Sequence, residues 1–204
     1  GLGDVYKRQP YGCFEQTSST TYPNILVLDY LKTTGQASPE VQMQAEQYIN
    51  LGYQRLTTFE VPGAPGSFSL FGNPPPDLML TAYGLQQFGD MSRVYDIDPR
   101  LIERIAAWLL AQQKNDGSWQ TVAGFRETTL TQMTDAMQVT AFVVWSLADA
   151  GYASDADTAL GVSYLRERVS QVETAYDLGL VANALVSYDL ALEGKTTGAT
   201  DAVL

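Results

Sequence analysis

The chain has 204 residues, 45% of them hydrophobic, with 12 basic against 23 acidic residues and no histidine. This length and apolar content predict one globular domain, or part of one, with a sizeable core. A formal net charge of −11 argues against nucleic acid or an anionic membrane surface as the partner. The absence of histidine excludes a Ser-His-Asp triad, a Cys-His pair and histidine ligands for zinc. No apolar run reaches the ~18 residues that a membrane-spanning helix needs.

The two ends of the chain differ from the rest. Residues 1–9 show no apolar periodicity and no hydrophobic signal-peptide region, so we interpret them as a non-native or linker-like segment. Residues 10–204 are then expected to form one domain. Because the chain stops shortly after a loop-like stretch at residues 194–198, we expect this domain to be a fragment that is incomplete at its C-terminal end.

Proline positions and capping residues predict an all-α fold. All nine prolines lie at or before Pro99, so residues 100–204 can hold long helices without breakers. Ser38 and Asp98 each precede a proline, which is typical of a helix N-terminus. Periodicity predicts helices at about residues 23–33, 39–56, 77–90, 99–113, 134–150, 155–169 and 174–193.

Three similar segments indicate an internal repeat of helical hairpins. They are Leu80–Tyr83, Val139–Phe142 and Leu180–Asn183, each on a helix that follows another helix. The helices around the second and third segments are apolar nearly all round, which predicts that they are buried. Buried helices that alternate with amphipathic ones favour a two-layer ring, with inner helices wrapped by outer ones.

A second motif supports the ring. Trp108, Gln113, Gly117 and Trp119 have the spacing of the glutamine-tryptophan motif, and the segment resembles that motif in α/α-toroid proteins such as triterpene cyclases. We expect the Gln113 side chain to cap the end of the next helix and Trp119 to pack across the loop. The alternative is an ordinary helix end with a turn at residues 115–117.

Chemistry is concentrated in residues 10–17. A lone cysteine is usually a small buried apolar residue, but Cys13 and Gln16 have the spacing that places both side chains on one face of a helical turn. A Cys13 thiolate there can attack the Gln16 carboxamide, expel ammonia and leave an internal thioester. Gly12 would let the backbone bend before the cysteine. A helix directly downstream would favour the thiolate.

This segment resembles the Gly-Cys-x-Glu-Gln thioester site of the alpha-2-macroglobulin and complement thioester proteins. The resemblance covers about residues 10–193 and continues through Gly52–Arg55, Gly66–Gly72 and the three motifs at residues 80–83, 108–119 and 139–142. Residues 37–39 and 72–75 are most similar to the bacterial, alpha-2-macroglobulin-like branch. The resemblance implies a thioester domain with an α/α-toroid fold, in which Cys13 and Gln16 react. We expect no cofactor and no metal.

The resemblance also implies a mechanism. In the family the thioester is shielded by neighbouring domains until a protease cuts a bait segment, and the exposed acyl group then captures a nucleophile. For this chain it implies a single-use covalent trap rather than an enzyme, with a lysine amine of a target protease and the neighbouring domains of the parent protein as partners. Membership in the bacterial branch implies the periplasm or cell envelope.

Two departures from the family pattern matter. Phe14 stands where the animal proteins have glycine. The loop Thr121–Leu130 lacks the histidine with which some complement members transfer the acyl group to hydroxyls. We therefore expect direct aminolysis to be faster than transfer to hydroxyls.

Four residues beside the reacting pair are candidates for supporting the thioester: Tyr11, Gly12, Phe14 and Glu15. Glu15 could orient the Gln16 amide or assist the loss of ammonia, or it could be a solvated or capping carboxylate. Tyr11 and Phe14 could keep water away from the thioester, or they could simply pack in the core.

Two other classes of protein compete with the trap. One is a toroid interaction module in which no functional thioester forms. The other is a toroid enzyme of the terpene-cyclase or prenyltransferase kind. The acidic pairs Asp96/Asp98 and Asp155/Asp157 lack the last acid of a cyclase Asp-x-Asp-Asp cluster and are better explained as helix caps. A prenyltransferase would need zinc ligands that usually include histidine.

Overall fold

The computed structural model describes residues 12–121, 133 and 135–192, and these residues form an all-α fold. Predictions about residues 1–9 and about the end of the chain lie outside the described residues. Short π and 3-10 segments, Ala148–Tyr152 and Val169–Gln171, follow the fifth and sixth helices. Within the described residues the α-helices are α1 (Phe14–Thr33), α2 (Pro39–Thr57), α3 (Leu78–Val94), α4 (Pro99–Leu110), α5 (Ala136–Leu147), α6 (Ala156–Arg168) and α7 (Ala175–Ala191).

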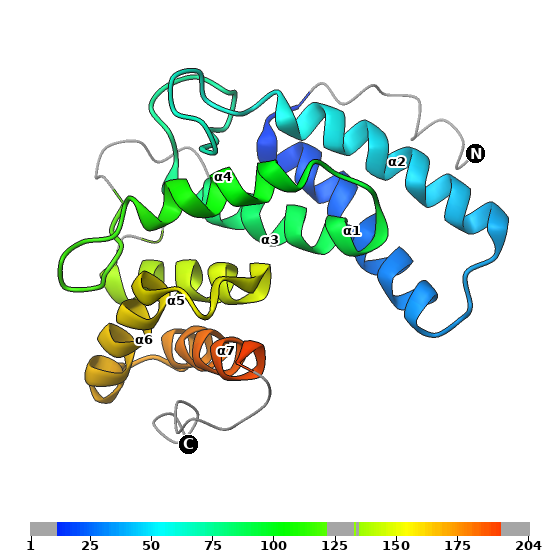
Figure 1. Cartoon of the computed structure of the whole chain (residues 1–204). Helices are drawn as coiled ribbons and strands as arrows, with labels where there is room; N and C mark the ends of the chain where they lie inside the picture. Colours follow the sequence, from blue (N-terminus) through cyan, green and yellow to red (C-terminus); the bar gives the residue numbers. More distant parts are fainter. Residues whose placement is uncertain (1–11, 122–132, 134, 193–204) are drawn as a thin grey trace.

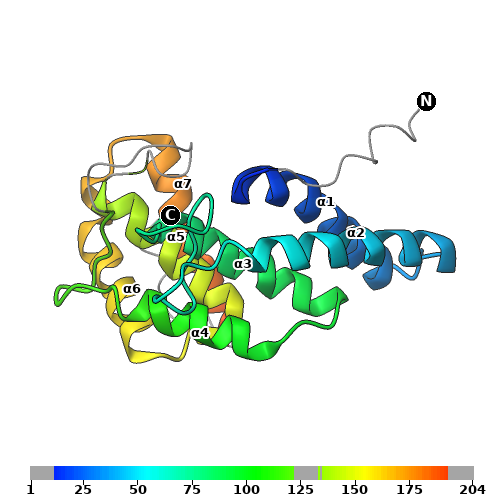
Figure 2. The ribbon, with the colours of Figure 1, turned by 90° about the horizontal axis from the view of Figure 1, so that it is seen from above.

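The helices form two layers (Figure 1). In the inner layer α1 packs on α3, α3 on α5 and α5 on α7, while α2, α4 and α6 pack against α1, α3 and α5 from outside. Figure 2 shows from above how α2, α4 and α6 flank this inner row. Helices α3 and α5 are buried on most sides, whereas α2 and α4 bury one stripe each. The predicted all-α, two-layer architecture is confirmed.

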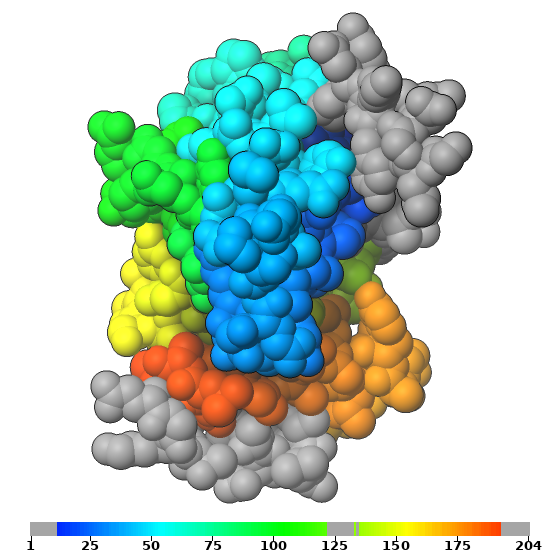
Figure 3. Space-filling view, turned by 90° about the vertical axis from the view of Figure 1, so that its right-hand side faces the viewer, coloured from blue at the N-terminus to red at the C-terminus, as the bar shows by residue number. Residues whose placement is uncertain are grey.

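Helix α7 is less buried than its sequence predicts. Its apolar composition on all sides predicts burial on all sides, yet Tyr176 and Leu190 are 61% and 66% exposed. Among the described residues α7 packs chiefly on α5 and the π segment, which cover one side only. Figure 3 shows α7 as the orange-red lower edge of the face on which α2 covers α1.

Helix α1 begins earlier than the sequence predicts. Because proline is rare inside helices, the pattern predicts a start at Pro23, but α1 begins at Phe14 and continues through Pro23. Half of its buried residues are polar, so this face shows no apolar periodicity. The buried residues are Phe14, Thr17, Ser18, Thr21, Ile25 and Leu28.

Small and polar residues on this face allow α1 and α2 to approach closely. A Cβ atom added at Gly52 of α2 would lie 2.1 Å from the Thr21 hydroxyl oxygen, so no larger residue fits at that crossing. The close approach brings the C-terminal half of α2 alongside the beginning of α1, as Figure 3 shows.

The helix caps follow the sequence. Ser38 accepts a hydrogen bond from the Val41 amide and Asp98 accepts one from the Arg100 amide, and each is followed by a proline at the first helical position. Asp155 caps α6 in the same way, through the Asp157 amide. The interpretation of Asp98 and Asp155 as helix caps is confirmed.

Two of the three repeated segments perform the same structural task. In α3 the Thr81 hydroxyl accepts a hydrogen bond of 2.9 Å from the amide of Phe68. In α5 the Thr140 hydroxyl accepts one of 3.0 Å from the amide of Trp119. Both aromatic side chains are fully buried. An inner helix therefore anchors an aromatic residue of the preceding loop in each case. In α7 the corresponding position is Val181, which has no hydroxyl.

In the glutamine-tryptophan motif Trp119 packs as expected, but Gln113 contacts a different helix from the one predicted. Trp119 is buried and its indole N–H donates to the Leu109 carbonyl at 2.7 Å. The Gln113 side-chain amide donates to the Asp157 carbonyl at 2.7 Å, in the first turn of α6. The prediction that it contacts the next helix, α5, is wrong. Helix α5 belongs to the inner layer, and the next outer helix begins beside the end of α4.

Two glycines of the loop between α2 and α3 provide a matched test of this packing. Both have positive φ, but a Cβ atom at Gly66 would lie 2.1 Å from the Arg104 carbonyl oxygen, whereas one at Gly63 would meet nothing within 4 Å. We expect Gly63→Ala to cost about 1 kcal/mol of unfolding free energy from its backbone conformation alone. Gly66→Ala should cost at least about 2 kcal/mol more, because it forces the loop away from α4.

Urea unfolding of the two variants measures this difference. Equal costs would mean that the loop does not depend on its close approach to α4.

Candidate functional site

The site lies at the N-terminus of α1. Cys13 is the residue directly before α1 and is half-buried, while Gln16 is exposed in the first turn. The Cys13 amide donates a hydrogen bond of 3.1 Å to the side-chain oxygen Oε1 of Gln16. The structure therefore brings together the two residues that the sequence paired, and it places them at the positive end of the helix dipole.

Gly12 leaves space for the folded-back Gln16 side chain. A Cβ atom at Gly12 would lie 2.9 Å from Oε1 and 3.0 Å from Cβ of Gln16. The sequence suggests a backbone bend as the reason for glycine here. The structure adds a steric reason, since any side chain would push the Gln16 carboxamide away from the Cys13 amide.

Phe14 fixes the start of α1 in the core. Its amide donates to the Leu70 carbonyl at 2.9 Å, and its side chain is completely buried. The ring packs against Phe68, Phe59 and Tyr83, with centroid distances of 5.4, 6.0 and 6.5 Å. These contacts are those of a core residue, and a role in excluding water from Cys13 stays a prediction.

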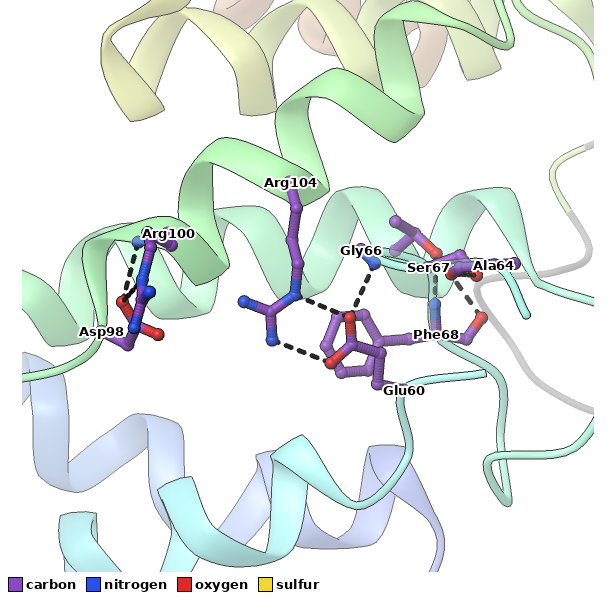
Figure 4. A network of polar contacts seen from close by, with 9 residues as sticks. Glu60, Ala64, Gly66, Ser67, Phe68, Asp98, Arg100 and Arg104 are labelled. Atoms are coloured by element: carbon purple, nitrogen blue, oxygen red, sulfur yellow. Dashed lines mark hydrogen bonds and ion pairs between the residues drawn. The ribbon is translucent and has the colours of Figure 1, made fainter. Parts of the chain in front are cut away.

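The loop that holds Phe14 is itself attached to α4 (Figure 4). The Glu60 carboxylate accepts hydrogen bonds from Nε and Nη2 of Arg104 at 2.7 and 2.8 Å, and the Gly66 amide adds a third at 2.7 Å. The hydrogen bonds from Arg104, helped by the one from Gly66, hold the pKa of Glu60 below its usual value of 4.5. The same loop supplies the Leu70 carbonyl and the ring of Phe68.

Glu15 lies near the start of α3. It is half-buried in the first turn of α1. Burial raises the pKa values of Asp77 and Tyr83, and the negative charge of Glu15 raises both further. Asp77, whose side chain caps α3 by accepting from the Leu80 amide, is thus a neighbour of the site that sequence reasoning missed. A role of Glu15 toward the Gln16 amide stays a prediction.

Arg55 is a second neighbour that the sequence did not reveal. It lies in the last turn of α2, and its Nη2 donates to the Gly12 carbonyl at 3.1 Å. Its guanidinium carbon lies 4.6 Å from the centroid of the Phe59 ring. The motif at residues 52–55 draws attention to Arg55, but its contact with Gly12 spans 43 positions and no local pattern predicts it.

Other sequence-based expectations can be compared with the structure only in part. Tyr11 and residues 122–130 lie outside the described residues. Within the described part of the chain, no group of three or more histidine, cysteine, aspartate or glutamate residues could hold a metal ion. No helix among the described residues has the length and apolar character required to cross a membrane.

Comparison with known proteins decides the family. The family described as "A-macroglobulin TED domain" matches residues 5–204. The chain belongs to this family. The resemblance to alpha-2-macroglobulin and complement thioester domains is therefore confirmed, while assignment to the bacterial branch stays a prediction.

Curated relatives of this TED domain are much longer than the chain. It is 29% identical to ovostatin of Gallus gallus over 191 residues, which cover 92% of this chain and 13% of ovostatin. It is 27% identical to thioester-containing protein 1 allele S3 of Anopheles gambiae over 192 residues, 92% of this chain and 14% of that protein. The chain thus spans about one seventh of the length of these relatives.

The Glu60–Arg104 contact predicts a pH dependence of stability. Because the folded state lowers the pKa of Glu60, the stabilisation is present above the usual pKa of 4.5 and is lost as the pH falls through the lowered value. We expect Glu60→Gln to lower the free energy of unfolding by about 1 kcal/mol at neutral pH. The difference from the wild type should shrink in acid, where both side chains are neutral.

Urea unfolding over a pH series measures this effect, with Glu103→Gln as the control. Glu103 is an exposed glutamate of α4 beside Arg104. A difference between wild type and Glu60→Gln that stays constant with pH would contradict the assigned role of the carboxylate.

Proposed function

We propose that this TED domain is a covalent-capture domain in which Cys13 and Gln16 form an internal thioester. The observation that carries the proposal is the hydrogen bond from the Cys13 amide to Oε1 of Gln16 in the first turn of α1. It holds the Gln16 carboxamide against the backbone of the residue that carries the nucleophile, in a chain that belongs to the TED-domain family. We further propose that the domain comprises residues 10–204.

Formation of the thioester releases ammonia. The Cys13 thiolate attacks Cδ of Gln16, the C–N bond breaks, and the amide nitrogen leaves as ammonia with the thiol proton. Negative charge develops on Oε1 during the attack. The Cys13 amide, which points at Oε1 from 3.1 Å, stabilises that charge as an oxyanion-hole donor does.

In the capture of a target, Cδ of Gln16 is again the electrophile, and Cys13 is the leaving group. A primary amine attacks Cδ of Gln16, the C–S bond breaks, and Cys13 leaves as a thiolate that takes up the amine proton. The product is a stable amide between Gln16 and the target. No group regenerates the thioester, so the domain acts once and is a trap rather than an enzyme.

The partners proposed for the parent protein follow from this chemistry. A lysine amine of an attacking protease is the nucleophile, and neighbouring domains of the same polypeptide shield the thioester until the protease cuts. We place the parent protein outside the cytoplasm, in the periplasm or cell envelope, in line with the resemblance to the bacterial branch.

Intact mass with and without methylamine tests the thioester. We expect the chain to be lighter by one ammonia, with its only thiol blocked, and to take up one methylamine at Gln16 with release of the Cys13 thiol. Cys13→Ala and Gln16→Ala should abolish the uptake because each removes one partner of the bond. Gln54→Ala, which changes an exposed glutamine of α2, should not affect it.

A chain of full mass with a free thiol and no uptake of methylamine would contradict the proposal. It would favour the alternative that the domain is an interaction module without a functional thioester.

Competition between an amine and an alcohol tests the preference of the acyl group. With methylamine and glycerol at equal concentration, we expect amide to be the dominant product, because the amine is the better nucleophile and the chain contains no histidine to relay the acyl group. Peptide mapping of Gln16 by mass spectrometry distinguishes amide from ester. Dominant ester would show that another residue assists transfer to hydroxyls.

A further inference from the structure

One peptide group links Arg55 to the electrophilic centre. The Gly12 carbonyl accepts a hydrogen bond of 3.1 Å from Nη2 of Arg55. The amide of the same peptide group, that of Cys13, donates a hydrogen bond of 3.1 Å to Oε1 of Gln16. The guanidinium, the peptide and the side-chain carbonyl therefore form a continuous chain of hydrogen bonds.

A chain of this kind strengthens its last bond. The peptide group is delocalised from nitrogen to oxygen, so a cation at its oxygen draws electron density from its nitrogen and makes the N–H a stronger donor. Arginine carries a positive charge that is delocalised over its planar guanidinium. Oε1 of Gln16 is thus polarised by a charge that does not contact it.

The position of the guanidinium is well defined. Its carbon lies 4.6 Å from the centroid of the Phe59 ring, and Nη1 donates to the Thr58 hydroxyl at 3.4 Å. Phe59 is buried and packs edge-on against Phe14, the first residue of α1. The cation is therefore attached to the same aromatic cluster that fixes the start of α1.

We propose that Arg55 is a positioning residue for the thioester, which polarises the Gln16 carbonyl through the Gly12–Cys13 peptide. This inference rests on the proposed function. The negative charge that appears on the oxygen during attack is stabilised in each reaction of that carbon: closure by Cys13, capture of an amine, and hydrolysis. Arg55 touches none of the reacting atoms and acts only through the peptide.

Hydrolysis distinguishes this role from a merely structural one. If Arg55 only held the backbone in place, its loss would loosen the site, admit water and speed spontaneous hydrolysis of the thioester. If Arg55 polarises the carbonyl, its loss slows attack by water and by amines together and leaves their ratio unchanged.

The experiment compares Arg55→Met and Arg55→Lys with a matched control, Arg168→Met. Arg168 makes the same two kinds of contact, since its Nη1 donates to the Tyr164 carbonyl at 3.3 Å and its guanidinium carbon lies 4.1 Å from the Tyr164 ring centroid. The two arginines differ in location, since Arg168 lies at the end of α6 whereas Arg55 contacts Gly12 beside Cys13. Rates of methylamine uptake and of thioester hydrolysis are measured for each variant.

We expect Arg55→Met to slow both reactions by about tenfold. Loss of a direct oxyanion-hole donor slows catalysis by about 10²- to 10³-fold. The effect of Arg55 should be smaller, because Arg55 acts on the donor, the Cys13 amide, and not on the oxygen itself. Arg55→Lys should lie between Arg55→Met and the wild type, and Arg168→Met should match the wild type. Faster hydrolysis or unchanged rates in Arg55→Met would overturn the proposal.

A second measurement does not need the thioester. This measurement is the NMR spectrum of the chain with an unreacted Gln16. Arg55→Met should shift the carbonyl carbon resonance of Gly12 and the amide proton resonance of Cys13 upfield. Arg168→Met should shift neither resonance. Unchanged resonances would overturn the role of Arg55. Absence of methylamine uptake by the wild-type chain would instead overturn the proposed function, so the two failures are distinguishable.

Discussion

The amide of Phe14 donates to the Leu70 carbonyl, and the geometry around Cys13 depends on that contact. It attaches the first residue of α1 to the loop between α2 and α3. The Phe14 ring packs in the aromatic cluster that it forms with Phe59, Phe68 and Tyr83. The loop cannot move independently, because Glu60 binds Arg104 of α4 with both carboxylate oxygens. The position of the Cys13 amide, which faces the Gln16 carbonyl, thus depends on α4 through this loop and on Arg55 of α2, which contacts the Gly12 carbonyl.

The same arrangement occurs twice among the residues that the structure describes, and the first of these copies adjoins Cys13. In both loops a buried aromatic residue offers its amide to a threonine of the following inner helix: Phe68 to Thr81 and Trp119 to Thr140. Each loop also contacts a later outer helix, through Glu60 in the first case and Gln113 in the second. Repeated hairpins bury their apolar faces against one another, and these contacts keep neighbouring hairpins aligned. In the first copy the aligned loop also contacts the start of α1, where the candidate site lies.

Sequence reasoning predicted helix ends correctly where the capping residues lie within one turn. It failed where buried polar residues remove the apolar periodicity of a helix. The helices that Ser38 and Asp98 cap could be predicted because a capping side chain and a proline act within one turn. The early start of α1 could not, since Thr17 and other small polar residues take buried positions where periodicity demands apolar ones. The exposure of α7 was missed for the opposite reason. Its composition is that of a buried helix, but composition does not say which neighbour covers it.

The sequence by itself determined the all-α class, the existence of each α-helix among the described residues and the proximity of Cys13 and Gln16. These depend on residues a few positions apart, whose relative placement follows from the geometry of one helical turn. Only the tertiary structure decided which groups surround that pair. Arg55 is 43 positions from Gly12, and Glu60 is 44 from Arg104. Contacts at such separations arise when helices pack, and packing depends on the shapes of both surfaces, so no pattern within either segment contains them.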